Sequence, residues 1–85
     1  MAEGNDVPTA AEKRLSEEVK SHLRLGEALE RLARVGEEVA ETLNALGMSE
    51  EADDLLARSA AYYRRAAEET RQAKHKREQL LELKG

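Results

Sequence analysis

The stretch NALGMSEEADD, residues 44–54, contains a signal that ends one helix and a signal that begins another. Gly47 can adopt the left-handed backbone conformation that follows many helices, because it has no Cβ. Met48 can then fold back onto Leu43, as in a Schellman ending. Ser49 is placed to cap a second helix, with acidic residues behind it at the positive helix end. A link this short makes the two helices antiparallel neighbours, so the stretch predicts a helical hairpin.

Towards the N-terminus, the sequence TAAE at residues 9–12 fits a capping box and predicts that the first helix begins near residue 10. Residues 1–8 would then form a flexible arm, and residues 9–85 a single helical-hairpin domain. Apolar residues recur at helical spacing over residues 10–46, at Leu15, Val19, Leu23, Leu25, Leu29, Leu32, Val35, Val39, Leu43 and Leu46.

Towards the C-terminus, a second helix is expected over about residues 50–83. Its best heptad seam alternates steps of four and three, which predicts coiled-coil packing with a left-handed supercoil. Many of the seam residues are small, so we expect the two backbones to approach closely. The seam consists of Ala52, Leu56, Ser59, Tyr63, Ala66, Thr70, Ala73, Arg77 and Leu80.

Two glycines interrupt the first helix, and each costs about 1 kcal/mol relative to alanine in a helix interior. Because Gly26 and Gly36 both fall on the apolar face, we interpret them as sites of close packing against the second helix. If the turn is the pivot, Ala33 lies against Tyr63 and Gly36 against Ala60. The alternative is a break near Gly26, which would give a three-helix bundle.

Composition excludes several classes of protein. Aromatic residues make up 2% of the chain and charged residues 38%, which disfavours a strand-built core. No uncharged run is long enough to span a bilayer, and there is no cysteine for a disulfide, a thiolate metal site or a nucleophile. We expect a soluble, cytoplasmic, all-α protein that does not insert into a membrane.

The first helix has more apolar surface than one neighbouring helix can cover, which predicts association with another chain. We expect a homo-oligomer, with a dimer of hairpins forming an antiparallel four-helix bundle favoured. The alternative is that the face binds a different protein. The predicted function is that of a noncatalytic interaction or assembly module, adaptor or scaffold-like. The predicted association face comprises Leu25, Leu32, Val35, Val39 and Leu46, with Tyr62 and Tyr63 as aromatic anchors.

Charge is unevenly distributed along the chain. Residues 37–54 contain seven acidic and no basic side chains, whereas residues 58–77 contain seven basic and two acidic ones. Clustered cations are typical of phosphate contacts, so a nucleic-acid-binding bundle is the alternative function. The acidic overall charge of −4 and the scatter of the bases around the helix count against it. The residues concerned are Arg64, Arg65, Arg71, Lys74 and Arg77.

The polar residues show no pattern of a catalytic or metal site. Neither His22 nor His75 belongs to the Glu-x-x-His motif of di-metal helical bundles. We therefore expect no enzyme activity, no metal and no other cofactor, and a metal-dependent enzyme is the most distant alternative. A polar layer of Glu18, His22, Lys74 and Arg77 is predicted to form ion pairs that fix the register of the hairpin.

Two short resemblances follow from the turn region. The spacing of Ala40, Leu43, Gly47, Ala52 and Leu56 resembles one tetratricopeptide-type helix pair, although no second repeat follows. The overall plan is similar to the small hairpins of type VII secretion, but the turn reads Ala-Leu-Gly where those have Trp-x-Gly. Both resemblances imply protein interaction through helix faces, and neither leads to a family assignment.

Overall fold

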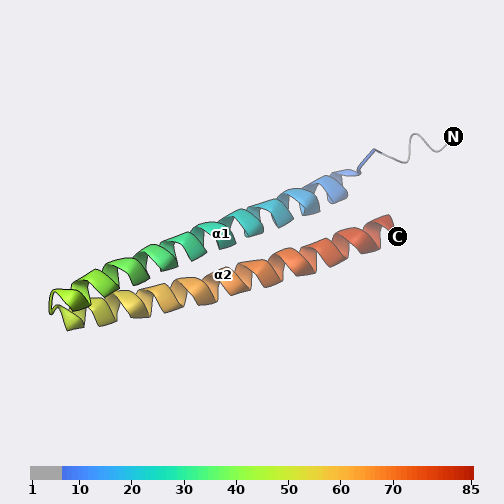
Figure 1. The fold of residues 1–85 in the computed structure, drawn as a ribbon. Helices are drawn as coiled ribbons and strands as arrows, with labels where there is room; N and C mark the ends of the chain where they lie inside the picture. Colours follow the sequence, from blue (N-terminus) through green and yellow to red (C-terminus); the bar gives the residue numbers. More distant parts are fainter. Residues whose placement is uncertain (1–6) are drawn as a thin grey trace.

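The computed structural model describes residues 7–85, which form two helices of 36 residues each. Helix α1 (Ala10–Ala45) and helix α2 (Ser49–Lys84) lie side by side and run antiparallel (Figure 1). The predicted hairpin is confirmed. Helix α1 continues through Gly26 without a break, so the three-helix alternative is wrong. The arm predicted over residues 1–8 lies mostly outside the described residues.

Helix α1 begins with the predicted capping box. The Glu12 backbone N–H donates to Thr9 Oγ1 at 3.1 Å, and the Thr9 backbone N–H donates to Glu12 Oε1 at 2.8 Å. These reciprocal bonds satisfy amides that would otherwise lack an intrahelical partner. The hydrogen bond from the Thr9 backbone also lowers the pKa of the Glu12 carboxyl.

The turn is a Schellman ending, as predicted. The Met48 N–H donates to the Leu43 carbonyl at 2.8 Å, the Gly47 N–H donates to the Asn44 carbonyl at 3.0 Å, and Gly47 has a φ of 79°. The prediction that Ser49 caps α2 is wrong. Helix α2 already begins at Ser49, because the Met48 carbonyl accepts the first helical hydrogen bond, from the Ala52 N–H at 3.1 Å. No side chain caps this helix.

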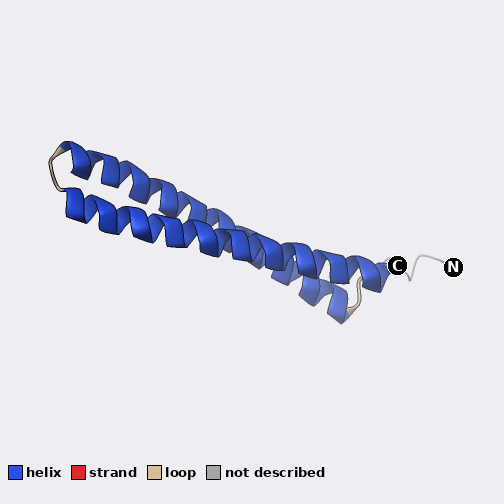
Figure 2. Ribbon diagram, turned by 90° about the horizontal axis from the view of Figure 1, so that it is seen from below, coloured by secondary structure: helices blue, strands red, loops and turns tan. Residues whose placement is uncertain are grey.

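Small residues form the interior between the helices, and the view in Figure 2 shows the helices crossing at a shallow angle. The largest side chain that is fully buried belongs to Ser59. Each buried alanine contributes only one methyl group to this interior, and larger side chains such as Leu29, Leu43 and Leu55 are half-buried beside them. Of the buried apolar residues only the first is larger than alanine: Val19, Ala33, Ala40, Ala52, Ala66 and Ala73.

The seam of α2 differs from the predicted one at alternate positions. The buried or half-buried positions step by three and then four, whereas three predicted members are exposed: Leu56, Thr70 and Arg77. A shift of one residue rotates a side chain by about 100° on a helix, which is enough to move it out of an interface. The observed seam is Ala52, Leu55, Ser59, Tyr62, Ala66, Glu69, Ala73, Lys76 and Leu80.

The two helical glycines differ in their surroundings. A Cβ added to Gly36 would overlap Ser59 Oγ, so the predicted close approach is confirmed there, but its partner is Ser59 rather than Ala60 or a tyrosine. A Cβ added to Gly26 would lie 3.5 Å from the Ala66 carbonyl oxygen, which is an ordinary contact. Of the two glycines, only Gly36 therefore lies where an added Cβ would force a neighbouring side chain, that of Ser59, to move.

Candidate association face

Helix α1 presents a row of large apolar side chains to solvent. The exposed fractions are 40% for Leu25, 48% for Leu32, 54% for Val35 and 45% for Val39, and Leu46 near the turn reaches 70%. These values are high for leucine and valine in the middle of regular helices. They identify a continuous apolar surface that the hairpin itself leaves uncovered.

The position of this row follows from the helix geometry. The side of α1 that packs against α2 contains Gly26, Ala33 and Ala40, which are all buried. Leu25, Leu32 and Val39 each immediately precede one of these residues. They therefore lie about 100° around the helix from the interface with α2.

Two further residues complete the row, and sequence reasoning missed both. Ala28 and Thr42 are exposed and fall between the larger residues, so that the steps alternate three and four throughout. Thr42 Oγ1 donates to the Glu38 carbonyl at 3.4 Å, so its hydroxyl has a partner within its own helix. We call the complete row the outer face: Leu25, Ala28, Leu32, Val35, Val39, Thr42 and Leu46. It has the heptad spacing of a second coiled-coil seam.

The two tyrosines differ in position. Tyr62 is half-buried in the seam between the helices, and the Tyr63 hydroxyl donates to Glu37 Oε1 at 2.7 Å. Glu37 is two residues before Val39, which places it about 160° away around α1. The structure therefore puts Tyr63 on the opposite flank of the hairpin from the outer face. The hydrogen bond to Glu37 raises the pKa of the Tyr63 hydroxyl.

The flank with Tyr63 has a smaller apolar surface. Leu56, seven residues before Tyr63, is 40% exposed, the same fraction as Leu25 on the outer face. Alanines occupy much of the rest. A shallow hollow of about 320 Å³ on this flank is lined by Glu30, Tyr63, Ala66, Ala67, Thr70 and Arg71.

The basic residues singled out from the sequence do not share one surface. Arg64 and Arg71 lie on one side of α2, while Arg65, Lys74 and Arg77 point in other directions, so the five spread over more than half of the helix circumference. Arg65 Nε lies 3.5 Å from Glu69 Oε2, and Arg71 pairs with Glu68. A phosphate backbone is contacted by cations along one surface, and two of the five, Arg65 and Arg71, already pair with glutamates of α2.

The polar layer forms with different members from those predicted. His22 Nδ1 lies 2.6 Å from Glu69 Oε1, and Lys76 Nζ lies 3.7 Å from Glu18 Oε2. Lys74 and Arg77, the predicted partners, make no ion pair within residues 7–85. The one-residue shift of the α2 seam explains the difference, because it turns Glu69 and Lys76 towards α1.

Glu69 is the only charged residue among those buried in the described part of the chain, with 8% of its surface exposed. Its hydrogen bond with His22 lowers its pKa, and the neighbouring Arg65 acts in the same direction. His22 and Arg65 thus occupy one carboxylate oxygen each.

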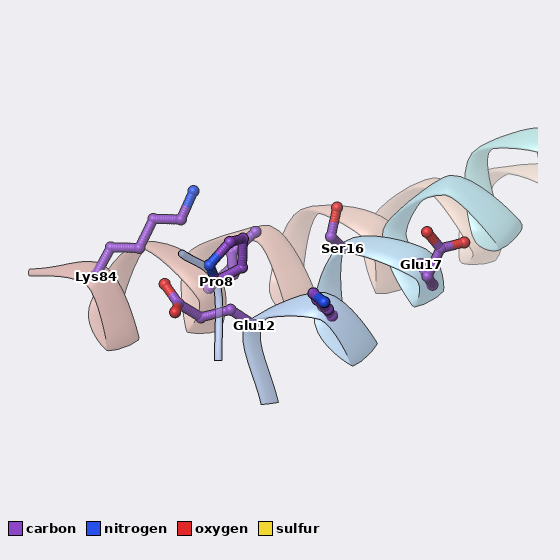
Figure 3. A pocket seen from close by; sticks show the side chains of 7 residues that line it. Pro8, Glu12, Ser16, Glu17 and Lys84 are labelled. Atoms are coloured by element: carbon purple, nitrogen blue, oxygen red, sulfur yellow. The ribbon is translucent and has the colours of Figure 1, made fainter. Parts of the chain in front are cut away.

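A groove lies at the open end of the hairpin, between the start of α1 and the end of α2 (Figure 3). Its volume is about 390 Å³, and it is lined by Pro8, Glu12, Lys13, Ser16, Glu17, Leu80 and Lys84. Glu12 already accepts the capping hydrogen bond of α1. Within residues 7–85, no three His, Cys, Asp or Glu side chains come together as a metal-binding group, and neither helix is apolar enough over a sufficient length to cross a membrane.

No protein-family model matches this chain, and no curated protein or solved structure gives a match. The candidate site is therefore defined by the geometry of the hairpin alone.

Proposed function

We propose that the protein is a noncatalytic assembly module whose hairpin associates through the outer face of α1. The observation that carries the proposal is the row from Leu25 to Leu46, which has coiled-coil spacing and is 40–70% exposed at its large residues. The favoured assembly is a dimer of hairpins, an antiparallel arrangement of four helices.

The contrast with the interior supports this proposal. Between α1 and α2 the buried apolar residues are alanines apart from Val19. The leucines and valines of the outer face are exposed instead. Burying a leucine or valine side chain contributes about 1.5–3 kcal/mol, and a single alanine methyl contributes about 0.8 kcal/mol. A contact that covers the outer face would therefore add stability that the hairpin alone does not have.

The proposal is tested by comparing Leu32→Glu with Leu56→Glu. Both place a carboxylate on an exposed leucine, but Leu32 lies on the outer face and Leu56 on the opposite flank, with exposed fractions of 48% and 40%. The molar mass of each variant is measured by light scattering, with helicity from circular dichroism. We expect the wild type and Leu56→Glu to associate, and Leu32→Glu to be monomeric or poorly folded.

Leu32→Ala distinguishes loss of contact from loss of folding, because alanine keeps the helix propensity high. A helical monomer with this variant would place Leu32 in the contact. Equal masses for the wild type, Leu32→Ala and Leu32→Glu, with unchanged helicity, would exclude the outer face as the site of association.

A further inference from the structure

The outer face has a charge pattern that specifies its occupant. Arg24, Arg31 and Glu38 line one edge of the row at steps of seven, and all three are exposed. Neither Arg31 nor Glu38 forms an ion pair through its side chain within residues 7–85. In a coiled coil, residues at such edge positions face the partner helix and select its orientation and register. This edge changes sign from basic to acidic along α1.

An edge of this kind is complementary to itself when the partner helix runs in the opposite direction. We propose, on the basis of the proposed function, that a second copy of this chain covers the outer face, with its α1 antiparallel. Leu32 of each copy then packs against Val35 of the other, and Arg31 of each lies beside Glu38 of the other. The contact is isologous, so each pair occurs twice across a two-fold axis.

This register uses the row from Leu25 to Thr42. With Leu32 opposite Val35, Val39 lies opposite Ala28 and Leu25 lies opposite Thr42, so larger residues face smaller ones across the contact. Arg31 of one copy and Glu38 of the other are then offset by two residues, or about 3 Å, along the helix axis. An arginine side chain can span this offset. Every outer-face position between residues 25 and 42 has a counterpart.

Each neighbouring register brings one pair of like charges together. A shift by one heptad in one direction places Arg31 against Arg31 of the second copy, although it also places Arg24 of each copy against Glu38 of the other. A shift in the other direction places Glu38 against Glu38. Like charges in such positions are destabilising. The register with Leu32 opposite Val35 pairs Arg31 with Glu38 twice and brings no like charges together along this edge.

The distribution of charge along the hairpin favours the antiparallel orientation as well. Residues 37–54, around the turn, contain seven acidic and no basic side chains. A parallel pair would bring the two acidic turns together. In the antiparallel register, Leu46 is level with Ser21 of the second copy, and the structure places that part of α1 beside the basic segment of α2, since Lys76 pairs with Glu18. Each acidic turn is then level with a basic part of the other copy.

The experiment exchanges charge between copies. In the homodimer of Arg31→Glu, two carboxylates meet at each of the two places, and in the homodimer of Glu38→Arg, two guanidinium groups meet there. We expect each single variant to raise the dimer dissociation constant about tenfold. In the heterodimer of the two variants, the unchanged Arg31 of one chain pairs with the unchanged Glu38 of the other at one place. At the second place the two substituted side chains meet, and they also have opposite charges. Native mass spectrometry of an equimolar mixture, with one chain tagged, should therefore show mainly the heterodimer. The double variant R31E/E38R should dimerise with itself like the wild type.

Arg34→Glu is the matched control. It also reverses an arginine on α1 and also disturbs charges four residues away, but it lies about 120° from the centre of the outer face. We expect its dissociation constant to equal that of the wild type, and no preference for pairing with Glu38→Arg. Circular dichroism of each variant separates weakened pairing from lost helicity.

Each outcome distinguishes the register from the function. If Leu32→Glu abolishes association but the charge variants dimerise like the wild type without preference in the mixture, this register is wrong and the association face stands. If the wild type is a folded monomer, both proposals are wrong. If Leu56→Glu abolishes association as Leu32→Glu does, the outer face contacts the opposite flank of another copy, a head-to-tail contact that gives larger oligomers.

Discussion

The half of the hairpin near the turn and the half near its open end are built differently. Near the turn, Gly36 packs against Ser59, and alanines fill the remaining buried positions. Towards the open end, Val19 is buried, the His22–Glu69 and Glu18–Lys76 pairs cross between the helices, and a groove of about 390 Å³ remains. The outer face lies in the half near the turn, and Leu25 is its last residue towards the open end.

The difference shows how close packing and association are linked. Where the helices approach closely, the fully buried positions hold only small side chains, which bury little apolar area each, and the larger Leu55 and Tyr62 are only half-buried. The large apolar residues of that half then lie on the outside of α1, where another chain can cover them. Where larger and polar residues separate the helices, no outer row of leucines is present on the described part of α1.

The sharpest way to break the packing near the turn is Gly36→Ala. The added Cβ overlaps Ser59 Oγ, and overpacking of this kind costs about 1–3 kcal/mol. We expect the free energy of unfolding in urea to fall by about 2 kcal/mol. The double variant G36A/S59A should recover most of the loss, because the Ser59 Cβ would lie 3.6 Å from the added atom. If Gly36→Ala stabilises the protein, the helices do not approach closely there.

Ser59→Ala alone should have a smaller effect of opposite sign. Ser59 Oγ is buried without a hydrogen-bond partner in the described structure, and a buried unsatisfied hydroxyl costs about 1–3 kcal/mol. Alanine also has the higher helix propensity. We expect the free energy of unfolding in urea to rise by about 1 kcal/mol. A loss of stability would mean that the hydroxyl has a partner, such as a water molecule.

Gly26→Ala is the substitution in the half near the open end that corresponds to Gly36→Ala near the turn. Here the added Cβ lies 3.5 Å from the Ala66 carbonyl oxygen and 3.6 Å from Thr70 Oγ1, so it fits. The gain in helix propensity is about 0.5–1 kcal/mol, and the thermal midpoint should rise accordingly. A decrease as large as that of Gly36→Ala would show that both halves are equally close-packed.

The pH dependence of the polar layer gives the smallest expected effect. The pKa of Glu69 is lower in the fold than its ordinary value of 4.5, so the unfolded chain binds more protons in that range. The contribution of Glu69 is therefore present above about pH 4.5 and is lost as the pH falls through its folded pKa. The thermal midpoints of the wild type and Glu69→Gln should differ slightly at neutral pH and converge in acid. A constant difference would show that the carboxylate does not titrate with a lowered pKa.

Features that depend on neighbouring residues were predictable from the sequence. The capping box at Thr9 and the Schellman ending at Gly47 belong to this group because each is built from residues within one turn of the chain. The face of α1 that packs against α2 was also predictable, because its small and apolar residues stand out from charged surroundings.

Which residues of α2 face α1 was not predictable, because similar residues are adjacent in its sequence. Leu55 and Leu56 are equally apolar, and Tyr62 and Tyr63 are identical, so spacing alone does not choose between them. The choice depends on contacts with the other helix, such as the hydrogen bond between His22 and Glu69, 47 residues apart. The placement of Tyr63 away from the outer face has the same origin.

Whether two copies of the chain associate through the outer face is best measured by sedimentation equilibrium of the wild-type chain over a wide concentration range. If the outer face binds a second copy, the mass approaches twice the 9.5 kDa of one chain and falls on dilution as the dimer dissociates. A helical species of 9.5 kDa at every concentration would contradict it, because the leucines of α1 would then remain exposed in a stable monomer.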